Sequence, residues 1–377
     1  MITITNKQDC SGCYACYSAC PTQCIQMKAD IQGFEYPAVD KSLCVECRIC
    51  EEVCQKSKKR LDAARPVAYG AKAKSDETRL KSSSGGIFTL LSEWVLRKNG
   101  VVYGAAMVNG ADVEHIRISQ SIELDQLCGS KYVQSRIGTA YTRVKEDLDR
   151  GLWVLFTGTP CQIGGLRNFL REKNYETLLC QDILCHGVPP QKAWKKYLSE
   201  KGFDTQKDMK VSFRDKSTGW SAFSVVIQQG RRLHKKRFLK DSYMRAFLSD
   251  IMLRPSCYDC SYKNMSYRAD ITVGDFWGIE RVAPDFADEY GISLVFNHSA
   301  KGKLVFEEIK QEMDYKNVTV EEAIQNNMNA VMGAREHGKR TLFFAKIDEK
   351  PFEWLVAKYV KGKLWIRAIR YIKRKLR

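Results

Sequence analysis

The stretch Cys10-Ser-Gly-Cys13-Tyr-Ala-Cys16-Tyr-Ser-Ala-Cys20-Pro21 is followed by a second one with the same spacing, Cys44-Val-Glu-Cys47-Arg-Ile-Cys50-Glu-Glu-Val-Cys54. In each stretch three cysteines stand three residues apart, and a fourth follows after a gap one residue longer. This spacing lets three thiolates bind three irons of one cubic cluster while the fourth binds the neighbouring cluster. The sequence therefore predicts two 4Fe-4S clusters whose ligands are crossed between the two stretches.

On this pattern the first cluster takes Cys10, Cys13, Cys16 and Cys54, and the second takes Cys20, Cys44, Cys47 and Cys50. Zinc and disulfides are the alternatives. A zinc ribbon has two separated pairs of cysteines, whereas here four cysteines share one run. A disulfide scaffold is typical of a small secreted chain. Both alternatives fit this sequence less well than iron-sulfur clusters do.

The N-terminal region resembles the bacterial two-cluster ferredoxin. Between the cysteine runs, the segment 25–37 is similar to the hairpin of that family, with Gly33 at the turn and apolar residues that would cover the clusters. The chain departs from the family at Gln55, which stands where a proline usually follows the last cysteine. That departure affects backbone stiffness and leaves the ligands in place. The resemblance implies an α+β ferredoxin-like cluster domain.

The length and composition suit a protein of two or three domains. The chain has 377 residues, of which 44% are hydrophobic, so it can fill a substantial core. We find no run of about 18 apolar residues that could span a membrane, and the first residues do not form a signal peptide. Eight of the fifteen cysteines are assigned to clusters, which need a reducing compartment. We therefore expect a cytoplasmic protein.

The net charge of +17 is concentrated at the C-terminal end, where residues 351–377 hold nine Lys or Arg and one Glu. The rest of the chain is only moderately basic, so no nucleic-acid partner is expected. Within residues 364–377, Trp365, Ile369, Ile372 and Leu376 share one side of a helix and the basic residues lie largely elsewhere. Such a helix suits peripheral membrane contact or packing on a partner subunit, with disorder as a third interpretation. Self-association of the chain also stays open.

The segment after the cluster domain has a helix start that suits phosphate. Lys81-Ser-Ser-Ser-Gly-Gly86 precedes a helical face formed by apolar residues at positions 87, 90, 91, 94 and 95, which ends at Asn99-Gly100. Free amides and the helix dipole favour an anion at such a place. An ordinary serine cap is the alternative interpretation.

Three predicted strands follow, over residues 101–108, 152–156 and 177–184. The second and third are each followed by a loop and a helix, and this succession predicts an α/β body with a largely parallel sheet. Ligands of such sheets usually lie outside the carboxyl ends of the strands. Cys161 and Cys185 fall in those two loops.

Cys161, Cys185, Cys257 and Cys260 could ligate a third 4Fe-4S cluster, because two loops and one Cys-x-x-Cys supply four thiolates. The alternative is that they are small buried residues, which is what scattered cysteines usually are. We interpret Cys24, Cys128 and Cys180 as buried thiols.

With these residues the chain resembles the beta subunit of coenzyme F-420 hydrogenase/dehydrogenase over residues 67–330. The similar motifs are Ser84-Gly-Gly86, Gly129-Ser-Lys-Tyr-Val133, Thr157-Gly-Thr-Pro-Cys-Gln162, Cys185-His-Gly187, Ser212-Phe-Arg-Asp-Lys216, Cys257-x-x-Cys260 and Gly274-Asp-Phe-Trp-Gly278. The resemblance implies FAD and one 4Fe-4S cluster, the latter held by the four cysteines just named. The flavin site it implies includes Ser84, Gly85, Gly86, Lys131, Gly158, Thr159 and Gln162. No Gly-x-Gly-x-x-Gly fingerprint occurs, so a Rossmann site for NAD is not expected.

Substrate reduction also needs a proton donor, and His186, Asp182 and Asp275 are the catalytic candidates. For His186 the alternative is a structural hydrogen bond that orients the cluster loop. Arg214 and Lys216 could hold an anionic substrate, or they could belong to a surface ion pair with Asp215.

We predict five regions, which are a two-cluster domain (1–60), a linker (61–75), the flavin-binding first part of the reductase body (76–150), its second part with the third cluster (151–335), and a basic tail (336–377). The expected function is an FAD-dependent iron-sulfur oxidoreductase. It would pass electrons between a ferredoxin or redox partner subunit and a small-molecule substrate, coenzyme F-420 or another organic compound. One alternative is an electron-transfer subunit without a substrate of its own, and another is an accessory protein that has lost activity.

Overall fold

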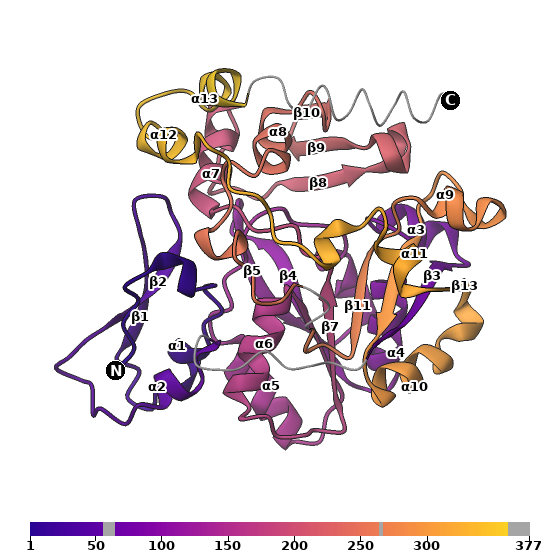
Figure 1. Cartoon of the computed structure of the whole chain (residues 1–377), viewed down its shortest axis with the longest axis horizontal. Coiled ribbons are helices and arrows are strands. Elements are labelled where there is room, and N and C mark those ends of the chain that lie inside the picture. Colours follow the sequence, from indigo (N-terminus) through magenta and orange to yellow (C-terminus); the bar gives the residue numbers. More distant parts are fainter. Residues whose placement is uncertain (56–64, 264–266, 361–377) are drawn as a thin grey trace.

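The computed structural model describes residues 1–55, 65–263 and 267–360. Residues 1–55 form a small N-terminal domain, called the cluster domain below, which lies at one side of a larger α/β body (Figure 1). Its helices are α1 (Ala15–Ala19) and α2 (Ile49–Glu52), and its strands β1 (Ile25–Ala29) and β2 (Glu35–Val39) form the predicted antiparallel hairpin. Gly33 at the turn has a φ of +87°, a conformation that glycine adopts without strain. The prediction of a hairpin is confirmed.

The body is built on one eight-stranded sheet of order β13-β3-β12-β11-β7-β6-β4-β5. Its strands are β3 (Val67–Ala73), β4 (Val101–Val108), β5 (Asp112–Ile118), β6 (Val154–Gly158), β7 (Leu178–Ile183), β11 (Ile271–Asp275), β12 (Ser293–Asn297) and β13 (Met313–Val318). The four central strands, β11, β7, β6 and β4, run parallel to one another. The remaining neighbours pair antiparallel, so the expected largely parallel sheet is a mixed sheet with a parallel centre.

Helices cover both faces of this sheet, because alternate residues of its central strands are apolar in both directions. Val102 and Leu155 pack with α4 (Ile87–Arg97) and α10 (Ala300–Glu308) on one face. Tyr103 and Phe156 pack with α5 (Ala140–Asp149) and α6 (Pro160–Phe169) on the other. The strands and the helix α4 that the sequence predicted are therefore present, with ends shifted by a few residues.

A second, three-stranded antiparallel sheet of order β10-β9-β8 lies beside the main sheet, as Figure 1 shows. Its strands are β8 (Lys210–Asp215), β9 (Ser224–Gln229) and β10 (Arg232–Arg237). The remaining helices are α3 (Asp76–Lys81), α7 (Gln191–Glu200), α8 (Ser242–Leu248), α9 (Ile279–Val282), α11 (Val320–Ile324), α12 (Arg340–Ala345) and α13 (Phe352–Tyr359). Helices α7, α8, α12 and α13 share a core with the three-stranded sheet.

Two predicted boundaries differ from the structure. The expected linker, residues 61–75, contains β3, which pairs with both β12 and β13 inside the main sheet. The expected tail, residues 336–377, contains α12 and α13, whose Phe343, Phe352 and Leu355 are buried. Both segments are polar or basic in overall composition, yet each carries enough apolar residues on one side to join a core. The predicted basic helix over residues 364–377 lies outside the described residues.

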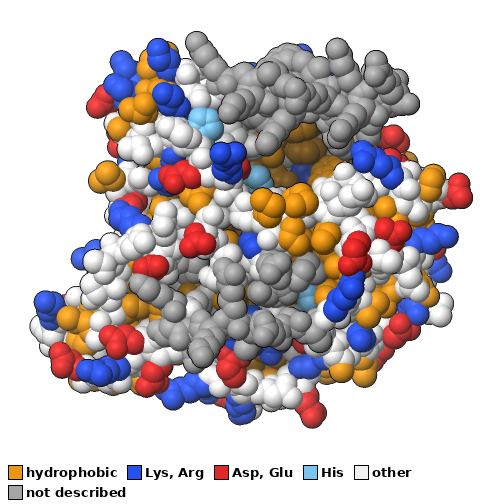
Figure 2. Space-filling view, viewed as in Figure 1, with side chains coloured by type: hydrophobic (Ala, Val, Ile, Leu, Met, Phe, Trp, Pro, Cys, Tyr) orange, Lys and Arg blue, Asp and Glu red, His pale blue; other side chains and the backbone are white. Residues whose placement is uncertain are grey.

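The described part of the chain has a surface on which basic and acidic side chains are mixed. Figure 2 shows Lys and Arg side chains interspersed with Asp and Glu on the visible face. Among the described residues no helix is both long enough and apolar enough to cross a membrane.

Candidate functional site

The two cysteine runs of the cluster domain adopt the same backbone conformation. In both runs the residues that flank the second cysteine have positive φ. These are Gly12 (+66°) and Tyr14 (+66°) around Cys13, and Glu46 (+53°) and Arg48 (+60°) around Cys47. Positive φ is uncommon for residues other than glycine, and such strained positions concentrate at functional sites. The repeated spacing therefore gives a repeated local fold, as expected for two equivalent ligand loops.

The first predicted ligand set is assembled in the structure. Cys10, Cys13, Cys16 and Cys54 line one cavity of about 370 Å³, counted to its open mouth. Burial, together with neighbouring Cys10 and Cys54, raises the pKa of the Cys13 thiol to about 11. Cys54 comes from the second run, so the fold brings it back beside the first run as crossed ligation requires. These four thiols suit a cationic iron core, which would replace their protons.

The second predicted set is the more exposed one. Cys44 and Cys50 lie beside the N-terminal amino group, whose pKa they help to raise after the larger effect of a hydrogen bond to Glu51. Cys47 is exposed. The Sγ atom of Cys20 lies 3.4 Å from that of Cys24, so Cys24, which is buried as predicted, borders this set.

Four cysteines far apart in sequence also meet in the body. Cys161 stands in the first turn of α6 rather than in a loop, and Cys185 follows β7. Cys257 ends the 3-10 helix η6 (Pro255–Cys257), and Cys260 follows the turn after it. Burial raises the pKa of Cys185 to about 12, with Cys257 and Cys260 adding to the effect. Burial likewise raises the pKa of Cys257 to about 12, with Cys161 and Cys260 adding to it.

The spacing of these thiols bears on the kind of metal centre. All fifteen cysteines are free, so no disulfide uses them. Within the described residues, no three Cys, His, Asp or Glu side chains converge closely enough to hold a single ion. The ligands of a cubic cluster bind four different irons, so they lie farther apart than the ligands of one zinc ion. Each set supplies four thiols, the number of ligands of a 4Fe-4S cluster.

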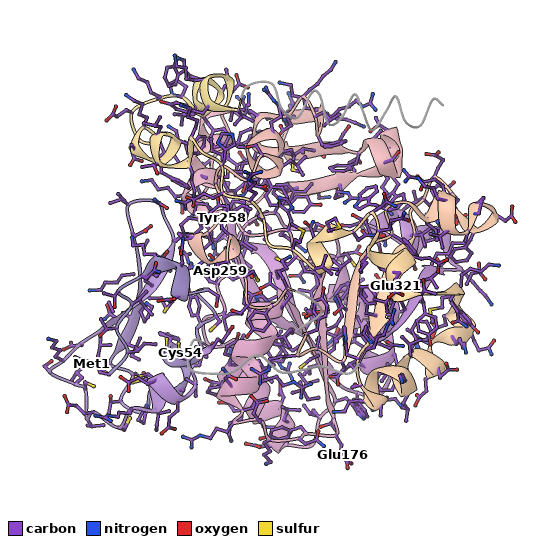
Figure 3. The ribbon with its side chains drawn as sticks, in the orientation of Figure 1. Met1, Cys54, Glu176, Tyr258, Asp259 and Glu321 are labelled. Carbon is purple, nitrogen blue, oxygen red and sulfur yellow. The ribbon has the colours of Figure 1, made fainter. Side chains whose placement is uncertain are left out.

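The third cysteine set borders the first. Cys13 is one of the neighbours that, after burial, raise the pKa of Cys161. The side chain of Gln55 donates a hydrogen bond of 2.5 Å to the carbonyl oxygen of Cys161, and Asn168 of α6 donates one of 3.0 Å to the carbonyl oxygen of Val53. In Figure 3, Cys54 lies on the side of the cluster domain that faces the body. Helix α6 thus joins the two ligand sets.

The start of α4 has the features expected of an anion site. Gly86, at φ +90°, is its N-cap, and no side chain caps the helix. The preceding serines bind elsewhere, since Ser84 Oγ donates to the Ile292 carbonyl and Ser83 Oγ accepts from Ser130. Among the described residues no acceptor is found for the amides of Ile87 and Phe88. The alternative of an ordinary serine cap is therefore wrong, and this helix start remains free for an anionic group.

The other predicted flavin residues lie in two separate places. Lys131 donates hydrogen bonds to the carbonyl oxygens of Gln126, Leu127 and Cys128 at the end of the 3-10 helix η3 (Ser121–Gln126), and burial lowers its pKa to about 8. Thr159 and Gln162 form the capping box of α6, next to Cys161. Gly158 ends β6. A hydrogen bond from Ser130 to Ser83 connects the region of Lys131 to the loop before α4, whereas Thr159 and Gln162 border the third cysteine set.

Comparison with known proteins gives two matches along the chain. A model of the 4Fe-4S dicluster domain matches residues 9–57, and a model of the C terminus of the coenzyme F-420 hydrogenase/dehydrogenase beta subunit matches residues 152–323. The chain joins a 4Fe-4S dicluster domain to an F-420 hydrogenase/dehydrogenase beta-subunit domain. It is thus an iron-sulfur protein of the oxidoreductase class, and the resemblance predicted from its motifs is confirmed over residues 9–57 and 152–323.

Comparison with solved structures gives a more distant match. A chain of the F-420-reducing nickel-iron hydrogenase complex from Methanosarcina barkeri matches with a TM-score of 0.48 at 14% sequence identity. The match covers 72% of this chain and 92% of that one. A comparison with curated proteins gave no match.

In the beta-subunit domain, each candidate proton donor already has a close neighbour. His186 Nε2 lies 2.6 Å from the Asp250 carboxylate, and its ring packs edge-on against Phe247. Asp182 is fully buried in β7, which raises its pKa well above the usual value, and it accepts a hydrogen bond from Thr272. Asp275 accepts two hydrogen bonds from Arg214, of 2.6 and 3.2 Å. The structure does not bring the three together in one cluster of contacts among the described residues.

The structure gives Arg214 and Lys216 partners that neither interpretation of the sequence named. Arg214 pairs with Asp275 rather than Asp215, and its guanidinium also lies 4.2 Å from the centre of the Phe223 ring. Lys216 donates to the carbonyl oxygens of Arg79, Ser84 and Tyr290, and burial lowers its pKa to about 7. These two residues therefore brace the Ser83–Ser84 segment before α4 from the side of the second sheet.

Two tryptophans beside this ion pair were missed in the sequence. Trp220 donates a hydrogen bond of 3.1 Å to Asp275, and its ring stacks on Trp277 with the centroids 4.7 Å apart. Trp277 stands in the Gly274–Gly278 motif, but nothing in the local sequence links it to Trp220. Trp220 is only 6% exposed, and the Arg214 guanidinium lies 5.5 Å from the centre of the Trp277 ring, so the stacked pair packs around the ion pair.

Proposed function

We propose that this protein is an FAD-dependent iron-sulfur oxidoreductase that passes electrons between a ferredoxin-like partner and coenzyme F-420 or another small organic molecule. The observation that carries the proposal is the contact between the first and third cysteine sets across α6. Electrons tunnel efficiently only over short distances, so adjacent ligand sets make a continuous route. A flavin, when bound, exchanges single electrons with clusters and pairs of electrons with organic molecules.

The chain's own residues support a flavin near the start of α4. Free amides of that helix would donate hydrogen bonds to the negative pyrophosphate, and Gly85 lets the preceding loop pack closely against β3 and β12. Lys216 and Arg214 hold the preceding loop in place by binding its carbonyl groups. The proposal thus includes FAD, a third cluster and an organic substrate.

A second candidate is an electron-transfer subunit that has no organic substrate and relays electrons within a larger complex. Cys47 of the second set is exposed, and Leu43 and Val45 beside this set are 56% and 64% exposed, which favours a docking partner at that end. The pairing of His186 with Asp250 and of Asp275 with Arg214 also engages two of the three candidate proton donors.

Iron and flavin content of anaerobically purified protein tests the proposal. Three 4Fe-4S clusters and one FAD require about twelve irons and one flavin per chain. About eight irons with one flavin would remove the third cluster, and the absence of flavin would remove the enzyme. Reduction of coenzyme F-420 by the ferredoxin-reduced protein distinguishes the enzyme from the relay subunit.

Replacement of a single cysteine of the third set tests whether the third cluster is present. Cys161→Ser should lower the iron content from about twelve to about eight per chain and abolish one cluster's electron paramagnetic resonance signal. Reduction of the flavin by ferredoxin should stop, while the two N-terminal clusters still reduce. Cys180→Ser is the matched control, because Cys180 is a free thiol of the body that is fully buried and lies outside all three sets. Equal iron content in both variants would contradict the third cluster.

A further inference from the structure

A buried arginine stands at the boundary between the cluster domain and the body. Arg254 is 1% exposed, and it precedes η6, which ends at the third-set residue Cys257. Its backbone is held on the body side, since its amide donates to the Val188 carbonyl and its carbonyl accepts from the Cys257 amide, both at 2.9 Å. These two hydrogen bonds hold the backbone of Arg254 beside the third cysteine set.

The side chain of Arg254 crosses into the cluster domain. Nε donates to the Cys10 carbonyl at 2.8 Å, Nη2 to the Glu35 carbonyl at 2.8 Å, and Nη1 to the side-chain oxygen of Gln134 at 3.0 Å. Nη2 also lies 3.7 Å from the Sγ atom of Cys10. A Cβ on Gly12 would come within 2.7 Å of Nη1, so this close approach depends on glycine there.

The polar partners of this guanidinium are all neutral in the described chain: two carbonyls, an amide and a thiol. The rings of Tyr36 and Phe34 lie 4.5 and 5.5 Å from its centre. A buried charge is normally compensated by an opposite one, because leaving water without a partner is costly. The cysteine thiolates of an iron-sulfur cluster would supply that negative charge beside Arg254.

We propose that Arg254 is a positioning residue that raises the reduction potential of the first cluster and holds it against the third. A nearby cation and a hydrogen bond to sulfur both stabilise the reduced cluster, which carries one more negative charge than the oxidised one. In a buried place the effect is stronger than in water. The inference rests on the cluster ligands of the proposed function but not on FAD or on the substrate.

Potentiometric titration followed by electron paramagnetic resonance tests the proposal on the full-length protein. Cys13→Ser first identifies the signal of the first cluster. Arg254→Gln should then shift the midpoint potential of that signal downward, and Arg254→Lys, which keeps the charge without the fork of donors, should shift it less. The other clusters should shift less than the first.

Arg340→Gln is the matched control. Arg340 is also a buried arginine at the domain boundary, where it donates to the Leu253 carbonyl and to the Gln32 side chain. Within the described part of the chain, none of its hydrogen bonds goes to a cysteine. Its replacement should leave the potential of the first cluster unchanged. An equal downward shift in both variants, or no shift in Arg254→Gln at wild-type iron content, would overturn the proposal.

A second measurement needs no variant. Wild-type protein labelled with nitrogen-15 in its arginine guanidinium groups should show a nitrogen coupling to the reduced first cluster in pulsed electron paramagnetic resonance. Absence of that coupling would overturn the proposal even if Arg254→Gln lost its iron. Iron near eight per chain, or missing flavin, would instead count against the proposed function and leave this test of the first cluster intact.

Discussion

At the scale of single residues, the body contains a pair of opposite charges that is largely removed from water. Arg214 has a side chain 4% exposed and Asp275 one 15% exposed, and the two are joined by two hydrogen bonds. Removing one member of such a pair leaves the other buried and uncompensated, which costs more than the pair itself contributes. Asp275 therefore has a structural task, whatever its part in proton transfer.

Asp275→Ala should lower the free energy of unfolding by about 3–5 kcal/mol, the usual cost of breaking a buried ion pair. Asp215→Ala is the control, because Asp215 pairs with the exposed Lys235 at 3.5 Å and should cost less than about 1 kcal/mol. Urea unfolding followed by tryptophan fluorescence measures both. Similar losses in the two variants would show that the Arg214 pair is not specially important.

Lys216 gives a pH dependence whose sign follows from its surroundings. Burial lowers its pKa to about 7, whereas the unfolded chain keeps the ordinary value of 10.5. Between these values the unfolded state binds a proton that the folded state lacks, so stability rises with pH across that window. Lys131, with a pKa lowered to about 8, acts in the same direction.

We expect the free energy of unfolding to increase from about pH 7 to about pH 10 in the wild type. In Lys216→Met the absolute stability should fall, because three carbonyl groups lose their donor, but the increase with pH should be smaller. Urea titrations at a series of pH values give both quantities. Parallel pH curves for the two proteins would contradict the assignment.

At the scale of elements, the start of α4 depends on a glycine that packs tightly against the sheet. A Cβ on Gly85 would lie 2.4 Å from the Ala71 carbonyl oxygen of β3 and 2.7 Å from the Ser293 amide nitrogen of β12. The loop before α4 is therefore packed closely against β3 and β12. Its position sets where the free amides of the helix point.

Gly85→Ala should displace this loop, weaken flavin binding by at least about tenfold and leave the iron content unchanged. The readout is flavin retained after gel filtration, set against iron in the same fractions. Gly338→Ala serves as the control, since a Cβ there meets nothing within 4 Å. Full flavin content in Gly85→Ala would place the flavin elsewhere.

Among the elements, the strands and helices with strong apolar patterns were predictable. Residues 101–108 form β4 as expected, and α4 begins at Ile87 as its apolar face indicates. β3 was missed because Val67-Ala-Tyr-Gly-Ala-Lys-Ala73 follows a basic, polar stretch and contains a lysine and a glycine. That strand is specified by its two neighbours in the sheet more than by its own residues.

At the scale of the whole molecule, electron flow depends on how the cluster domain sits on the body. Helix α6 packs closely against the first cysteine run just before α1, since a Cβ on Gly165 would lie 2.9 Å from the Cβ atom of Cys13. Arg136 adds a second connection, since it pairs with Glu35 of β2 at 2.7 Å and with Asp112 of β5 at 3.0 Å. The first and third cysteine sets are therefore held at a fixed separation.

Gly165→Val should wedge α6 away from α1 and slow the reduction of the third cluster and the flavin by about tenfold or more, because tunnelling falls steeply with distance. The iron content should stay at the wild-type level. Rapid-mixing spectroscopy with reduced ferredoxin measures the rates, with Gly338→Val as the control. An unchanged rate would mean that electrons take another route.

The sequence by itself determined the cluster domain and the centre of the sheet. The spacing of eight cysteines and the apolar strands are local patterns, and their meaning does not depend on distant residues. Only the tertiary structure decided that Arg214 pairs with Asp275, that Lys216 binds three carbonyls and that Arg254 reaches Cys10. Each of these partners comes from a distant part of the chain, and a buried charge takes whichever partner the packing brings within reach.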